Sequence, residues 1–173
     1  MPARSPPPPL DIAALEALAL RYVERFATTQ GKLAAYLSRK MRERGWSGPA
    51  ADSAAIAARM AALGYVDDRA YAEARARSLT RRGYGARRVS QALRAAHVAE
   101  GDAAPVVEES REDAFAAALA LARRRRFGPF AAAPADERSR RRQIGAMLRA
   151  GHSFSLAKRI IDASPGEILE PDA

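Results

Sequence analysis

Apolar side chains recur every three or four residues along most of this chain, with polar and charged positions between them. That spacing predicts amphipathic helices, because it places the apolar side chains on one face of a helix. The clearest stretch carries Leu33, Leu37 and Met41 and ends at Gly45, and it lies between two similar stretches. We therefore expect three helices between residues 10 and 64.

The same pattern returns twice further along the chain. The predicted second helix of each group ends in a similar way, and these endings lie 52–54 residues apart, at Met41-xxx-Gly45, Leu93-xxx-His97 and Met147-xxx-Gly151. Repetition at such a period is typical of linear arrays in which each unit packs mainly on its neighbours. We therefore predict an all-α fold of three tandem three-helix repeats that form an elongated, curved array. A simple helical bundle is the alternative.

Proline, glycine and charge mark the expected boundaries. We predict a disordered Pro-rich leader, three repeats and a C-terminal tail, over residues 1–9, 10–64, 65–110, 111–164 and 165–173. In the second repeat, a short acidic segment with Val106 and Val107 follows the second helix. The long first helix of the third repeat is expected to begin after Glu109 and to run through four consecutive arginines, Arg123–Arg126.

Composition supports the helical class and excludes several kinds of site. Alanine makes up roughly a quarter of the chain and aromatic residues only 6%, which argues against a β-sandwich. Because cysteine is absent, disulfides and thiolate metal sites are excluded. No apolar run approaches the roughly 18 residues of a membrane span, and the first residues lack the apolar core of a signal peptide. We expect a soluble cytoplasmic protein.

Charge indicates an anionic partner. The chain has 29 Lys and Arg residues against 20 Asp and Glu residues, a formal net charge of +9. Residues 123–149 hold nine arginines and two acidic residues, whereas residues 99–113 hold six acidic residues and one arginine. Because an arginine fork binds phosphate or carboxylate in bidentate fashion, both a DNA backbone and an acidic protein surface fit. Arginine bias from a GC-rich genome is the alternative explanation.

Candidate chemical groups favour structural roles. We interpret the adjacent Asp67 and Asp68 as caps of the helix that follows them, because no further ligand stands at metal-binding spacing. His97 and His152 each end a predicted second helix, where a positive imidazole is favourable. No nucleophile–base arrangement, phosphate-binding loop or dinucleotide fingerprint appears in the sequence. We therefore expect a protein that is not an enzyme and has no metal or cofactor.

The stretch from Gly64 to Val98 predicts a turn, a capped helix, a glycine-flanked break and a second helix. It resembles the central signature of the RecX family, bacterial regulators of the RecA recombinase, through Gly64-Tyr65-Val66-Asp67-Asp68, Tyr71-Ala72, Arg82-Gly83-Tyr84-Gly85, Arg87-Arg88-Val89 and Leu93. The chain departs from the family pattern at Ala92, usually glutamate, and at His97, usually glycine. The resemblance implies three helical repeats and a regulator that binds RecA–DNA filaments. It also implies inhibition of recombinase and co-protease activity in DNA repair, recombination and the SOS response.

Twelve arginines are the expected contacts to the partner or to DNA: Arg81, Arg82, Arg87, Arg88, Arg94, Arg123, Arg124, Arg125, Arg126, Arg140, Arg141 and Arg142. We expect Arg81, Arg82, Arg87 and Arg88 to lie in one small region around the Gly83-Tyr84-Gly85 break. The expected partners are the RecA filament and single-stranded or duplex DNA, met by a monomer and without a membrane. Two alternatives remain, a stand-alone nucleic-acid-binding protein of helix-turn-helix type and a helical accessory subunit of an enzyme.

Overall fold

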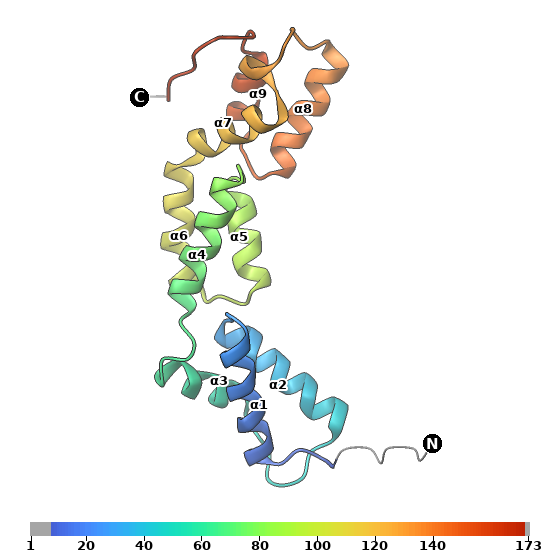
Figure 1. The fold of residues 1–173 in the computed structure, drawn as a ribbon, viewed down its shortest axis with the longest axis vertical. Coiled ribbons are helices and arrows are strands. Elements are labelled where there is room, and N and C mark those ends of the chain that lie inside the picture. Colours follow the sequence, from blue (N-terminus) through green and yellow to red (C-terminus); the bar gives the residue numbers. More distant parts are fainter. Residues whose placement is uncertain (1–7, 172–173) are drawn as a thin grey trace, which may run out of the picture. The chain divides into compact units, whose positions relative to one another are not determined.

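The computed structural model describes residues 8–171, and over that range the chain is helical (Figure 1). The helices are α1 (Ile12–Arg25), α2 (Gln30–Arg44), α3 (Ser53–Ala62), α4 (Asp68–Arg81), α5 (Ala86–Ala95), α6 (Glu100–Glu112), α7 (Ala114–Arg125), the 3₁₀ turn η1 (Gly128–Phe130), α8 (Glu137–Arg149) and α9 (Phe154–Asp162). The described residues contain no strand beyond one bridging pair between Leu10 and Trp46. The prediction of an all-α fold is confirmed.

The chain divides into two compact units. Unit 1 comprises the residues up to Tyr71 together with Ala96–Ala99, and unit 2 comprises Ala72–Ala95 and the residues from Glu100 onward. None of the helices in the described range is long and apolar enough to cross a membrane.

Unit 1 has a core of large aliphatic side chains on α1, α2 and α3. Leu33 and Leu37, which the four-residue spacing placed on one helix face, are fully buried and pack with Leu15 and Ile56. Side-chain caps fix the helix starts, because each accepts an N–H group that the helix itself leaves unpaired. The Asp11 carboxylate, for example, accepts from the backbone N–H of Ala14 at 2.8 Å.

Unit 2 has a core in which alanines alternate with larger side chains. Ala118, Ala122 and Ala157 are buried beside Met147 and Ile160. Small side chains let α7, α8 and α9 approach closely, which is how an alanine-rich chain with few large apolar residues still excludes water.

The predicted endings of the second helices are confirmed by their backbone. Gly45, His97 and Gly151 all have positive φ, at 81°, 54° and 99°. A left-handed residue just after a helix turns the chain and satisfies the last carbonyls. Only glycine adopts this conformation at little cost, so the non-glycine His97 holds a strained backbone.

Each unit also contains one copy of a recurring joint, in which a glycine at the start of a second helix lies against one of these left-handed residues. In unit 1, a Cβ atom on Gly31 would lie 2.3 Å from the Cβ of His97. In unit 2, a Cβ on Gly85 would lie 2.6 Å from the carbonyl oxygen of Gly151, and the Gly85 N–H donates to the Ala150 carbonyl at 2.9 Å. The two joints therefore need glycine for close backbone approach.

The structure corrects the boundaries around the acidic segment. Residues 99–113 are not a short connection, since α6 occupies Glu100–Glu112 and ends before α7 begins at Ala114. Acidic residues in the first turn stabilise this helix through its dipole, and the helix continues through Pro105. The four-arginine run is also shorter as a helix than expected, because Arg126 leaves α7 with φ of 56°.

The interpretation of two capping residues needs revision, whereas that of a third holds. Asp67 does cap α4, accepting from the Ala70 N–H at 2.8 Å. The buried Asp68, however, accepts from the N–H of Gln30 at 2.8 Å and so serves the start of α2. His152 is also not a positive helix cap, because it is 98% buried and burial lowers the pKa of its imidazole.

The ends of the chain were predicted as a leader and a tail. Residues 1–7 and 172–173 lie outside the described residues, whereas Leu10 donates to the Gly45 carbonyl at 3.0 Å and so holds the beginning of the chain on unit 1. The segment after α9 packs on unit 2. The Gly166 N–H donates to the Pro129 carbonyl at 2.9 Å, and Leu169 contacts the core.

Candidate functional site

A hollow of about 470 Å³ on unit 2 gathers basic side chains from three helices. Arg88 comes from α5, Arg124 and Arg125 from α7, and Arg149 from α8. The rest of the wall is uncharged, formed by Tyr84, Leu121, Phe127, Ala146 and Ala150. We refer to this site as the four-arginine hollow.

Local sequence explains why these side chains meet. The Gly83-Tyr84-Gly85 break ends α4 with Gly83 at φ of 78°, and a Cβ there would lie 2.7 Å from the backbone nitrogen of Leu121. This contact brings the start of α5 close to α7. The buried Leu121 and Met147 anchor α7 and α8 beneath the hollow, so the last turns of both helices carry their arginines to its rim.

The hollow is electrostatically unbalanced. Among the described residues, none of its four arginines forms an ion pair, and the Nη1 atom of Arg88 has only a long 3.5 Å contact to the Gln91 side chain. Guanidinium groups without counter-charges create a positive potential and offer paired N–H donors to planar oxyanions. The arrangement therefore suits a phosphate or a carboxylate from a partner.

The four arginines expected to lie together are instead distributed over different surfaces. Arg88 lines the four-arginine hollow, whereas Arg87 lines a separate hollow of about 370 Å³ that also contains Arg94. Consecutive residues on a helix point about 100° apart, which separates Arg87 from Arg88. Arg81 lines a third hollow, of about 170 Å³, beside three carboxylates, and Arg82 stacks on the Tyr84 ring at 5.5 Å.

The remaining predicted arginines differ in whether they already contact another side chain of this protein. Arg124 and Arg125 line the hollow, but Arg123 stacks on the Phe130 ring at 5.1 Å. Arg126 is exposed beyond the end of α7. On α8, Arg141 pairs with Glu137 at 2.9 Å, and Arg142 donates to the Ser139 hydroxyl at 3.0 Å.

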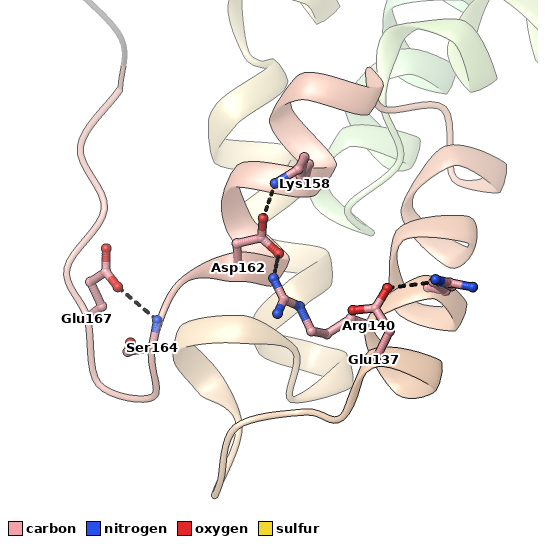
Figure 2. A network of polar contacts seen from close by, with 7 residues as sticks. Glu137, Arg140, Lys158, Asp162, Ser164 and Glu167 are labelled. Atoms are coloured by element: carbon pink, nitrogen blue, oxygen red, sulfur yellow. Dashed lines mark hydrogen bonds and ion pairs between the residues drawn. The ribbon is translucent and has the colours of Figure 1, made fainter.

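Arg140 joins two helices. Figure 2 shows its guanidinium directed at Asp162 of α9, which also receives Lys158. The hydrogen bond from Lys158, followed by that from Arg140, lowers the pKa of the Asp162 carboxyl, and the Asp162 contact in turn raises the pKa of Arg140. Because it is paired with Asp162, Arg140 links α8 and α9.

Arg149 is the hollow residue that sequence reasoning did not select. It is an isolated arginine, four residues before Ser153 and outside the basic runs that drew attention to Arg123–Arg126 and Arg140–Arg142. The sequence did contain one signal for Arg149, its position in the last turn of α8. This helix ends next to Gly151, which lies against Gly85 and Arg88 of the preceding repeat, so the last turn of α8 lies near that repeat.

The described part of the chain shows no metal centre. Across residues 8–171, no group of three or more His, Asp or Glu side chains lies close enough to hold a metal ion. The one buried imidazole, His152, places its Nε2 2.9 Å from the Gly83 carbonyl oxygen. The Nε2–H therefore donates to a backbone group, and the ring links the end of α8 to the break before α5.

Comparison with known proteins identifies the family to which this chain belongs. Residues 67–105 match the family model for the second three-helix domain of RecX. Regulatory protein RecX of Myxococcus xanthus is 37% identical over 163 residues, covering 87% of this chain and 86% of the relative. The chain belongs to the RecX family. Regulatory protein RecX of Halorhodospira halophila is also 37% identical, over 133 residues and 77% of each chain.

Solved structures of the RecX family share the fold. A crystal structure of RecX from Lactobacillus salivarius has a TM-score of 0.59 and 18% identity, covering 87% of this chain and 94% of its own. A second crystal structure, of a regulatory protein RecX, has a TM-score of 0.58 and 25% identity, covering 87% of this chain and 74% of its own. The helical fold of this chain is thus shared with solved structures of RecX proteins.

Proposed function

We propose that this chain is a monomeric, cytoplasmic regulator that binds RecA–DNA filaments and inhibits their recombinase and co-protease activity in DNA repair and the SOS response. Two observations support the proposal. The chain belongs to a family whose named members are regulatory proteins, and unit 2 carries a basic hollow with no internal counter-charge. A regulator of this kind acts by occupying a surface of the filament, so it needs binding groups and no chemistry of its own.

The four-arginine hollow is the observation that carries the proposal. The hollow of about 470 Å³ is lined by four arginines and by no acidic residue. A phosphate or a carboxylate that balances this charge must therefore come from a partner. A filament offers both groups, phosphates from its DNA and acidic side chains from its protein subunits. In this proposal the hollow contacts one of these anions, and the other arginines of unit 2 extend the contact along the filament.

A double charge reversal tests the proposal. Arg88→Glu with Arg125→Glu should weaken inhibition of RecA strand exchange and of ATP turnover on single-stranded DNA at least about 10-fold, because each lost charge-assisted contact is worth about 1.5–3 kcal/mol. Inhibition by the wild-type protein should also fall steeply with salt if DNA phosphates are bound. Circular dichroism of both proteins checks that the helices are retained.

A matched control reverses the same amount of charge elsewhere on unit 2. Arg75 and Arg138 are exposed and line none of the three hollows described above, so Arg75→Glu with Arg138→Glu should leave inhibition within about twofold. Equal losses in both double variants would mean that only net charge matters, and the hollow would not be the site. Binding to naked duplex as tight as binding to the filament would instead favour a stand-alone nucleic-acid-binding protein.

A further inference from the structure

Unit 1 carries a row of aromatic rings on α1 and α2 that the predicted arginine surface does not include. The Tyr22 ring is stacked on the Tyr36 ring with centroids 4.3 Å apart, and the Phe26 ring is tilted against Tyr22 at 5.2 Å. Phe26 caps the C-terminal end of α1, and Tyr36 lies in the middle of α2. We call Phe26, Tyr22 and Tyr36 the aromatic row.

Cations stand at both ends of the aromatic row. The Arg25 guanidinium lies 5.7 Å from the centroid of Phe26. At the other end, Arg39 and Lys40 lie 5.5 Å and 6.0 Å from the centroid of Tyr36. Helix α2 as a whole carries five Lys and Arg residues and a single acidic residue, Glu43. Helix α1 adds Arg21 and Arg25 against Glu16 and Glu24, so the two helices together carry seven basic and three acidic residues. The surface around the row is therefore positive on balance.

Core packing accounts for only part of the row. Tyr22 and Tyr36 pack one side against the core of unit 1. Phe26 does not belong to that core, and it stays 51% exposed at the end of the row. The Phe26 ring touches Tyr22 and the Arg25 guanidinium, but about half of the residue stays open to solvent and can stack on the apolar face of a ligand.

We propose that the aromatic row is a second nucleic-acid contact, which binds single-stranded nucleic acid by stacking a base on Phe26. Arg25, Arg39 and Lys40 then hold the flanking phosphates. Aromatic rings interleaved with cations are what sequence-independent single-strand binding requires, because every base has a face that stacks and every nucleotide carries a phosphate. An acidic peptide would engage the cations and leave the ring uncovered.

The acidic neighbour Glu43 does not oppose this assignment. It pairs with Arg39 at 3.4 Å and with Lys40 at 2.6 Å, and all three side chains are at least partly exposed. Exposed ion pairs are worth little because water screens them. A phosphate therefore replaces the Glu43 carboxylate at small cost, and the pairs keep both cations close to Tyr36 in the unbound protein.

The test measures binding of the full chain to a fluorescently labelled oligothymidine of about ten nucleotides, a length within the usual range for one binding module. Phe26→Ala should weaken binding at least about 5-fold, since stacking of one base is worth about 1–3 kcal/mol. Phe26→Trp should retain binding. Phe154→Ala is the matched control, because Phe154 is 58% exposed and no cation of the described residues stacks on it.

An abasic strand of the same length separates stacking from charge. Phe26→Ala should not change affinity for the abasic strand, whereas Arg25→Gln with Arg39→Gln should weaken binding to both strands. Repeating the measurements with Arg88→Glu and Arg125→Glu present removes any contribution of the four-arginine hollow. An unchanged affinity of Phe26→Ala for oligothymidine in that background, or an equal loss on both strands, would overturn the proposal. Because no recombinase is present, the outcome is independent of the proposed regulation.

Discussion

Stability near neutral pH should depend on His152, the buried histidine of unit 2. Its side chain is only 2% exposed, its Nε2–H donates to the Gly83 carbonyl over 2.9 Å, and its Nδ1 has no hydrogen-bond partner among the described residues. A second proton on this ring would place a charge inside the protein without an acceptor. Burial accordingly lowers the pKa of His152 below its ordinary value of 6.5.

The direction of the pH effect follows from proton binding. In the unfolded chain the imidazole takes up a proton as the pH falls through about 6.5, whereas in the folded chain it remains neutral to lower pH. The stabilisation is therefore present above pH 6.5 and is lost as the pH falls below it, with a slope of up to about 1.4 kcal/mol per pH unit. Between pH 7.5 and 5.5 the free energy of unfolding should fall by up to about 1.3 kcal/mol.

Urea unfolding followed by circular dichroism at pH 7.5, 6.5 and 5.5 measures this loss. In His152→Gln the amide N–H₂ retains a donor for the Gly83 carbonyl, and the pH dependence should disappear over this window. His97→Gln is the matched control, because it removes the other histidine of the chain, which is exposed, and leaves His152 in place. Asp136 and Asp162 have lowered pKa values and titrate at more acidic pH. Parallel pH dependence in the wild type and His152→Gln would refute the reasoning.

Two further predictions concern backbone contacts. Gly85→Ala should lower the free energy of unfolding by about 1–3 kcal/mol, because its Cβ would lie 2.6 Å from the Gly151 carbonyl oxygen. Gly101→Ala is the control in the same urea titration and should be neutral or stabilising, because a Cβ at Gly101 meets open space. Asp67→Ala should cost about 1 kcal/mol as a lost cap, whereas Asp68→Ala should cost more, about 1–3 kcal/mol, because it leaves the first N–H of α2 unpaired. Equal thermal midpoints for the two aspartate variants would contradict the cross-helix role.

The sequence predicted features that depend on neighbours along the chain. Helical spacing identified Leu33 and Leu37 as buried, and the recurring ends at Gly45, His97 and Gly151 identified the repeat. Both signals are local, since a helix face and a left-handed ending are set by a few consecutive residues.

Features that depend on contacts between distant segments were missed. Asp68 looked like a cap of its own helix, but its carboxylate reaches Gln30, 38 positions earlier in the chain. His152 was interpreted as a positive residue at a helix end, but its ring contacts the carbonyl of Gly83, 69 positions earlier in the chain. Arg149 was also missed, because its place in the four-arginine hollow depends on residues of other helices. The spacing of apolar residues predicts which face of its helix a residue occupies, but it does not predict which distant segment packs against that face.

The recurring joint is not repeated at Gly45 or at the start of α8. Each left-handed ending is a docking place for a preceding segment, and on the first repeat that place is already filled by Leu10, whose N–H donates to Gly45 and whose carbonyl accepts from Ser47 at 2.8 Å. At the other end, α8 begins at Glu137 under an Asp136 cap and has no glycine in its first turn to seat on a following repeat. The close glycine contact of the recurring joint therefore has no counterpart at the start of α8, and at Gly45 the end of α2 is bonded to Leu10 instead of to another helix start.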